Sequence, residues 1–154
     1  MIRVLFVCHG NICRSPMAEF VLKDLVRRQR IDQNFQIDSA ATSREELGND
    51  IHRGTKAKLR EVGVPFEKRC ARQIDRNDYD FYDYIIVMDD ENLRGLRRIL
   101  GPDREGKIHK LLSFAGEDRD IADPWYTGNF DQTYEDILQG LTGFLKTIQF
   151  QAEK

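Results

Sequence analysis

The 154-residue sequence has none of the long apolar runs that mark membrane-spanning or exported chains. No apolar stretch approaches the roughly 18 residues that a membrane-spanning helix needs, which excludes a helical membrane protein. The apolar residues 2–7 are too short for the core of a signal peptide, so we expect a cytoplasmic protein. Internal repeats, low-complexity tracts and linkers are also lacking, and the length predicts a single domain over residues 1–154.

The sequence has few cysteines and histidines, and its net charge is small. The three cysteines are an odd number, which argues against a secreted disulfide framework and agrees with a reducing compartment. His9, His52 and His109 have none of the spacings that bind metal, so we predict no metal site. The formal net charge of -2 gives no electrostatic reason to expect nucleic acid or an anionic membrane as a partner.

Apolar runs typical of buried strands alternate with helical patterns along the chain. We expect strands at residues 4–7, 35–37, 84–88 and 108–114. We expect helices around residues 17–25, 57–62, 90–99 and 134–148, and a loop over residues 40–53. This alternation predicts an α/β fold, a single three-layer domain in which helices flank a small parallel sheet of about four strands.

The most informative segment directly follows the first predicted strand. Cys8 and Arg14 enclose the run His9-Gly10-Asn11-Ile12-Cys13, and Ser15-Pro16 come next. Ser15 fits a helix N-cap and Pro16 the first helical position. A strand end, a tight loop and a helix N-terminus direct several backbone N–H groups at one point, which is a common way to bind phosphate.

Two side chains give this loop its chemistry. The positive field of the converging N–H groups favours the ionised, nucleophilic form of the Cys8 thiol. Arg14 presents a planar fork of donors that matches two phosphate oxygens. We therefore predict a phosphate-binding loop after the first strand with a nucleophile inside it.

A second segment offers the acid that such a nucleophile needs. A thiolate that attacks a phosphate ester expels an alkoxide or phenoxide, and a general acid must protonate that oxygen. Asp123 is the candidate, because its segment comes after the last predicted strand and before the last helix, and so belongs at the carboxyl edge of the sheet. Pro124 stiffens the chain there and biases Asp123 toward an extended backbone. Trp125 and Tyr126 are expected to form aromatic walls for a flat substrate ring, although Tyr126 has an equal alternative in packing against the last helix.

The run from Cys8 to Pro16 resembles the signature loop of the low-molecular-weight protein tyrosine phosphatases, and the run from Asp123 to Tyr126 resembles their acid loop. The resemblance extends through residues 38–40, 71–73 and 88–89, so it covers nearly the whole sequence. It implies a small parallel sheet flanked by helices and hydrolysis of phosphotyrosine in proteins or peptides, and of small aryl phosphates. It implies no metal or organic cofactor.

The same resemblance implies a role for each site residue. Cys8 would form a cysteinyl-phosphate, Arg14 would clamp the phosphate, and Asp123 would act first as acid and then as base. Ser15 would hydrogen-bond the thiolate, while Asn11 and Ser39 would hold the shape of the loop. The phosphate-binding residues would be His9, Gly10, Asn11, Ile12, Cys13 and Ser15.

Cys13 has two readings. It packs as a small apolar residue or, as the resemblance implies, forms a reversible disulfide with Cys8 that shields the nucleophile.

Three positions depart from the family pattern. His9 stands where an apolar residue is common, residues 43–47 lack the aromatic residue that many members carry near Glu45, and Arg69 stands where a histidine is often found. These changes affect substrate choice and loop support, whereas the nucleophile, clamp and acid are intact.

Three other functions remain open alternatives. A phosphoarginine phosphatase is disfavoured by Ile12, because a smaller threonine is expected there in members that are specific for phosphoarginine. An arsenate reductase needs further cysteines to relay a disulfide, and only Cys70 lies outside the loop. A module that binds phosphotyrosine without turnover would have no need for both Cys8 and Asp123.

Overall fold

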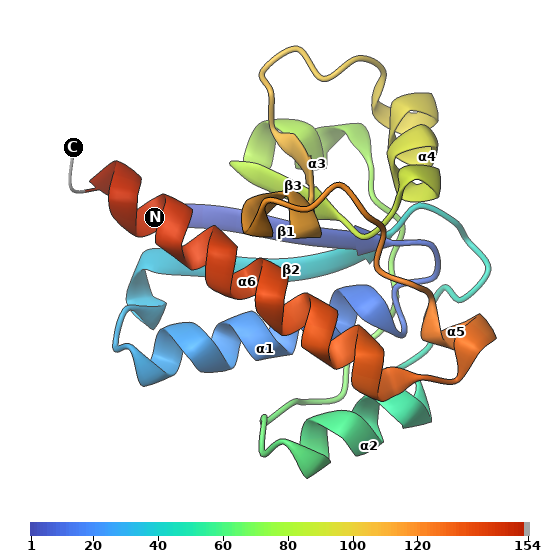
Figure 1. The fold of residues 1–154 in the computed structure, drawn as a ribbon. Helices are drawn as coiled ribbons and strands as arrows, with labels where there is room; N and C mark the ends of the chain where they lie inside the picture. Colours follow the sequence, from blue (N-terminus) through green and yellow to red (C-terminus); the bar gives the residue numbers. More distant parts are fainter. Residues whose placement is uncertain (153–154) are drawn as a thin grey trace.

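The computed structural model describes residues 1–152, which fold around one parallel sheet (Figure 1). Within those residues the sheet has four strands in the order β2-β1-β3-β4, and each neighbouring pair is parallel. The strands are β1 (Ile2–Cys8), β2 (Phe35–Ala41), β3 (Tyr84–Val87) and β4 (Ile108–Lys110). The α-helices are α1 (Arg14–Arg28), α2 (Arg53–Glu61), α3 (Arg76–Phe81), α4 (Asp90–Leu100), α5 (Pro124–Thr127) and α6 (Phe130–Ala152), and the 3-10 helices are η1 (Asp32–Asn34) and η2 (Leu111–Ala115).

Helices cover both faces of the sheet, as Figure 1 shows with α1 and α6 on one side and α3 and α4 on the other. Val4 and Phe6 of β1 belong to the core that α1 and α6 complete. The intervening residues Leu5 and Val7 pack with Leu96 of α4 in a second core. Burial on both faces explains the continuous apolar run of β1. The predicted three-layer α/β fold is confirmed. The predicted bounds of the single domain, residues 1–154, include residues outside those that the structure describes, so these bounds stay a prediction.

The order of the strands positions the functional loop. From the central strand β1 the chain crosses to β2 on one side, and later strands lie on the other side. Parallel sheets bind ligands at the carboxyl ends of their strands, where the connections from such neighbouring strands diverge. The loop from Cys8 to Arg14 lies at that point, between β1 and α1.

The predicted start of α1 is wrong by two residues. The helix begins at Arg14 with Cys13 at the N-cap position, and no side chain caps it. Ser15 and Pro16 are therefore the second and third helical residues, instead of the N-cap and the first helical residue. The Ser15 hydroxyl lies 3.0 Å from Cys8 Sγ, so it serves the loop and not the helix end.

Other boundaries also differ from the prediction. The expected strand over residues 108–114 ends at Lys110, because β4 pairs only with residues 85–87 of β3, and Leu111–Ala115 then form η2 against α6. The strand expected at residues 35–37 continues to Ala41 along the whole length of β1. The prediction missed the short helices α3 and α5, which have too few residues for a clear apolar period.

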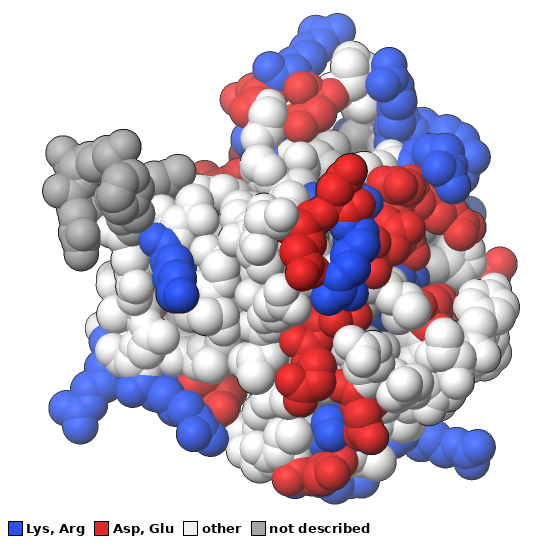
Figure 2. All heavy atoms as spheres, viewed as in Figure 1, with Lys and Arg blue, Asp and Glu red and all other residues white. Residues whose placement is uncertain are grey.

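Charges of both signs are interspersed on the surface. On the face shown in Figure 2, acidic side chains gather in a band over the segment after η2 and the first turns of α6. Cations within this band offset its negative charge: Arg119 bonds Glu117 and Asp136, and Lys110 bonds Asp120.

In the part of the chain that the structure describes, each helix is too short or too polar to cross a membrane.

The contact of α6 with η2 depends on a glycine. A Cβ atom at Gly143 would lie 2.2 Å from the backbone oxygen of Phe114. Because backbone atoms on both sides resist movement, we expect Gly143→Ala to lower the free energy of unfolding by about 1–3 kcal/mol, despite the better helix propensity of alanine. Thermal denaturation measures this change, and exposed Lys146→Ala on the same helix is the control. An unchanged midpoint for Gly143→Ala would contradict the close approach.

Candidate active site

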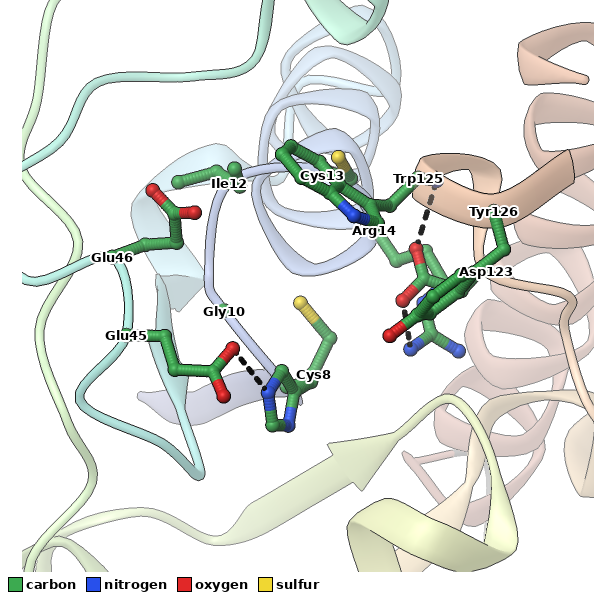
Figure 3. Close-up of a pocket in the computed structure, with 11 residues that line it drawn as sticks. Cys8, Gly10, Ile12, Cys13, Arg14, Glu45, Glu46, Asp123, Trp125 and Tyr126 are labelled. Carbon is green, nitrogen blue, oxygen red and sulfur yellow. Dashed lines mark hydrogen bonds and ion pairs between the residues drawn. The ribbon is translucent and has the colours of Figure 1, made fainter. Parts of the chain in front are cut away.

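The loop after β1 forms the base of a pocket of about 100 Å³ (Figure 3). Three segments meet there: the loop itself, residues 45–46 of the connection after β2, and the segment from Asp123 to Tyr126. In Figure 3, Cys8 Sγ lies between Glu45 and Glu46 on one side and Asp123 and Tyr126 on the other. The lining residues are Cys8, His9, Gly10, Ile12, Cys13, Arg14, Glu45, Glu46, Asp123, Trp125 and Tyr126.

The backbone of the loop is turned so that its carbonyl groups face away from the pocket. Five of them accept hydrogen bonds from outside the loop: Cys8 from Thr42 N (3.0 Å), His9 from Ser43 N (3.0 Å), Asn11 from Arg69 Nη2, Ile12 from His52 N (2.8 Å) and Cys13 from Thr55 Oγ1 (3.1 Å). The N–H of a peptide unit points opposite to its carbonyl. Several N–H groups of residues 9–14 therefore point inward, which makes an anion-binding concavity.

Asn11 holds this shape from behind the loop. Its φ of 58° lies in the left-handed region, which asparagine tolerates better than most residues. The Asn11 side-chain nitrogen donates to Ser15 Oγ (2.8 Å) and to Ser39 Oγ (2.9 Å), and Ser39 donates in turn to Glu19 (2.6 Å). Asn11, Ser15 and Ser39 are buried and do not line the pocket. The network ties the loop to β2 and α1.

Cys8 Sγ has two contacts with the first turn of α1. It lies 3.0 Å from Ser15 Oγ and accepts a hydrogen bond from Ser15 N at 3.4 Å. Both contacts tie the sulfur atom to the start of α1. The structure therefore brings the predicted nucleophile and the predicted hydrogen-bond donor together.

Arg14 is buried, with 2% of its side chain exposed, and only part of its guanidinium is used by the protein. Nη1 donates to Asp89 (2.7 Å) and to the carbonyl of Ile121 (2.8 Å), while Nη2 contacts Asp123 at 3.4 Å. Among the described residues Nε has no partner. A buried donor without a partner is costly, so the free edge of the fork is suited to an oxyanion in the pocket.

The charges around Arg14 keep it protonated. Burial alone would lower the pKa of Arg14, but the negative charges of Cys8, Asp89 and Asp123 together raise it. Sequence reasoning assigned no role to Asp89. Its position directly after β3, at the same sheet edge as Cys8, is the signal that could have identified it.

Asp123 begins the short helix α5. Its Oδ1 accepts from Trp125 N (3.0 Å), which makes it the N-cap, while Oδ2 faces Arg14. Pro124 is the first helical residue, as the Asp-Pro pair favours. Asp123 thus lies across the pocket from Cys8 in Figure 3, with 23% of its side chain exposed.

The mouth of the pocket has an aromatic wall and an acidic wall. Trp125 and Tyr126 are 56% and 83% exposed and line one side, so Tyr126 does not pack into the core against α6. Opposite them, His9 Nε2 lies 2.9 Å from Glu45 Oε2. Two of the positions that depart from the family pattern therefore contact each other. The His9 side chain stands at the rim, and only its backbone belongs to the anion-binding loop.

Cys13 and Arg69 complete the surroundings of the nucleophile. Burial, followed by the charge of Cys8, raises the pKa of Cys13 to about 12, so this thiol stays protonated at neutral pH. A disulfide between Cys8 and Cys13 stays a prediction.

Arg69 bonds the carbonyls of Asn11 and Asn49 (3.2 Å to the latter), and burial lowers its pKa. Within residues 1–152 no group of histidine, cysteine and acidic residues is arranged to hold a metal ion.

These features define an α/β protein whose first strand ends in a cysteine-bearing oxyanion loop that faces a carboxylic acid. Residues 3–154 match the family of low molecular weight phosphotyrosine protein phosphatases, and the chain belongs to this family. The family and its named members are protein-tyrosine phosphatases, so the chain is a hydrolase of this class. The predicted family is confirmed.

Similarity to named relatives and to solved structures extends over nearly the whole chain. The low molecular weight protein-tyrosine-phosphatase YfkJ of Bacillus subtilis is 43% identical over 152 residues, 97% of both chains. Its crystal structure superposes with a TM-score of 0.94 at 42% identity, over 98% of this chain and 96% of that one. A crystal structure of a drosophila arginine phosphatase is also similar, with a TM-score of 0.87 at 34% identity over 96% and 98% of the two chains.

Proposed function

We propose that this protein dephosphorylates phosphotyrosine in protein substrates of the cytoplasm through a cysteinyl-phosphate intermediate. The observation that carries the proposal is the position of Cys8 in the loop of inward N–H groups, in the same pocket as Arg14, whose Nε has no partner among the described residues. Both groups are complementary to a phosphoryl group attacked by sulfur.

In the first step, the Cys8 thiolate attacks phosphorus, and the bond from phosphorus to the tyrosine oxygen breaks. Protonated Asp123 gives its proton to that oxygen, so that tyrosine leaves as a neutral phenol. Arg14 and the loop N–H groups stabilise the charge on the three transferred oxygens. Asp89 and the Ile121 carbonyl hold the Arg14 plane in place from behind.

In the second step, water attacks phosphorus and the sulfur–phosphorus bond breaks. The Asp123 carboxylate accepts a proton from the water, and Ser15 stabilises the departing thiolate. Inorganic phosphate leaves, and both groups return to their starting states. No metal or organic cofactor takes part in this sequence.

The proposed function is tested by comparing peptides that carry phosphotyrosine, phosphoserine or phosphoarginine at equal concentration. We expect release of phosphate from phosphotyrosine and little from phosphoserine, whose short side chain does not reach the base of the pocket. Phosphoarginine is the second candidate, because one structural relative is an arginine phosphatase. Ile12 lines the pocket in this chain and favours the phenyl ring. Faster turnover of phosphoarginine would overturn the preference for phosphotyrosine.

Arsenate reduction is not favoured by the positions of the cysteines. Cys70 is exposed and lines a different pocket from Cys8, together with Glu19, Asp38, Ser39 and other residues. A disulfide relay requires sulfur atoms that reach one another.

The acidic wall predicts a preference among phosphotyrosine substrates. Glu45 and Glu46 line the mouth, so a peptide with lysine beside its phosphotyrosine should react faster than one with glutamate there. We compare kcat/KM for the lysine peptide with kcat/KM for the glutamate peptide. We expect Glu45→Gln to reduce this ratio about threefold at low salt, which is the size of effect expected for a partly exposed charge. Glu67→Gln, away from the pocket, is the control. If Glu45→Gln and Glu67→Gln give the same ratio, the wall does not select the flanking charge.

A further inference from the structure

The N-terminal end of α2 is bonded to the phosphate-binding loop. His52 N donates to the carbonyl of Ile12 (2.8 Å), and Thr55 Oγ1 donates to that of Cys13 (3.1 Å). These are two of the hydrogen bonds that turn the loop N–H groups inward. The backbone of His52 is therefore fixed relative to the base of the pocket, although its ring lies outside the pocket lining.

The His52 ring contacts the acid-bearing segment, residues 123–130, at two residues, Trp125 and Phe130. It stacks on Phe130, the first residue of α6, with ring centroids 5.4 Å apart and planes at 17°. It meets Trp125 edge to face, with centroids 5.6 Å apart and planes at 76°. The space beside it is filled, because a Cβ atom at Gly54 would lie 2.3 Å from the Phe130 ring.

The orientation of this ring is set by the helix end. His52 Nδ1 accepts a hydrogen bond from Gly54 N at 3.0 Å, which makes His52 the N-cap of α2. In the neutral ring the proton is then on Nε2. One residue thus has two separable functions, a cap formed by Nδ1 and an aromatic contact formed by the ring faces and edge.

The helix that follows Asp123 is short and mostly exposed. Helix α5 has four residues, of which Pro124 is buried while Trp125 and Tyr126 are largely exposed. Asp123 is held to this helix by its hydrogen bond with Trp125 N, so a shift of Trp125 shifts the carboxylic acid. Small displacements of a catalytic group reduce catalysis strongly.

We propose that His52 is a positioning residue, whose ring holds Trp125, and with it Asp123, at the correct place opposite Cys8. This inference rests on the proposed function, because it assigns Asp123 as the acid. It differs from a role in stability alone, since it predicts a defect in kcat/KM that is larger for leaving groups that need protonation by Asp123.

Two substitutions separate the ring from the cap. His52→Asn keeps a side-chain acceptor for the cap but removes the ring, and His52→Phe keeps an aromatic ring but removes the acceptor. We expect His52→Asn to lower kcat/KM about tenfold for phenyl phosphate, which needs protonation, and to leave kcat/KM for p-nitrophenyl phosphate much less affected. We expect His52→Phe to restore most of the rate on phenyl phosphate.

A spectroscopic measurement tests the same contact without turnover. Trp125 is the single tryptophan of the chain, so its fluorescence reports on this segment alone. We expect His52→Asn to shift the emission to longer wavelength and to increase quenching by acrylamide, and His52→Phe to stay close to the wild type.

The possible outcomes are distinct. If His52→Asn leaves both the fluorescence and the ratio of the two substrates unchanged, the positioning role is wrong. If His52→Phe is the variant that loses rate on both substrates equally, His52 acts as a helix cap and the inference is likewise overturned. If the wild type hydrolyses neither substrate, the proposed function fails, while the fluorescence still decides whether the ring holds Trp125.

Discussion

Cys8→Ser should reduce the turnover of aryl phosphates by about 10⁴-fold or more, as expected when a nucleophile is removed. The hydroxyl of serine is a far weaker nucleophile than a thiolate at neutral pH. The inward N–H groups and Arg14 are unchanged by the substitution, so the variant should still bind inorganic phosphate or a phosphotyrosine peptide. Initial rates on p-nitrophenyl phosphate and calorimetric titration with phosphate measure the two quantities.

Cys70→Ser is the matched control for this variant, because Cys70 is exposed and lines a separate pocket. It should retain wild-type turnover. Rapid mixing of the wild type with p-nitrophenyl phosphate should also release one equivalent of p-nitrophenol ahead of phosphate if the intermediate accumulates. Substantial activity in Cys8→Ser would contradict the mechanism at its first step.

Asp123→Asn should show the second largest effect, and the effect should depend on the leaving group. Asparagine retains an oxygen that caps α5, so the local structure is kept while the transferable proton is lost. For phenyl phosphate, whose phenoxide leaves poorly, we expect a loss of about 10²–10⁴-fold in kcat/KM, which reports the step in which the leaving group departs. For p-nitrophenyl phosphate, whose leaving group is stable as an anion, the loss should be much smaller.

A series of substituted phenyl phosphates measures this dependence as a slope of log(kcat/KM) against leaving-group basicity. The slope should become steeper in Asp123→Asn than in the wild type. Asp131→Asn is a suitable control, because Asp131 is exposed on the first turn of α6 and pairs with Lys58 instead of lining the pocket. Parallel slopes for all three proteins would show that Asp123 does not protonate the leaving oxygen.

Much of the architecture was predictable from local pattern. The continuous apolar run of β1 indicated a strand buried on both faces, and the long stripe of α6 indicated a helix. The errors fall where long-range contacts decide the boundary. β4 ends at Lys110 because only residues 85–87 of its partner β3 pair with it. The following residues, Leu111–Ala115, pack against α6 instead.

The start of α1 shows the same limit at the site. Serine followed by proline favours an N-cap and a first helical residue. In the fold, Ser15 bonds Cys8 and Asn11 instead, because the loop must direct its N–H groups inward. Local propensity gave way to the hydrogen bonds that shape the pocket.

The sequence by itself determined the chemistry of the loop, since Cys8, Arg14 and their neighbours form one contiguous segment whose geometry follows from a strand joined to a helix. Only the tertiary structure decided which groups surround it. Asp89 behind Arg14, Arg69 on the Asn11 carbonyl and His52 against Trp125 come from segments distant in sequence. Their partners are set by the packing of helices on the sheet, which no local pattern records.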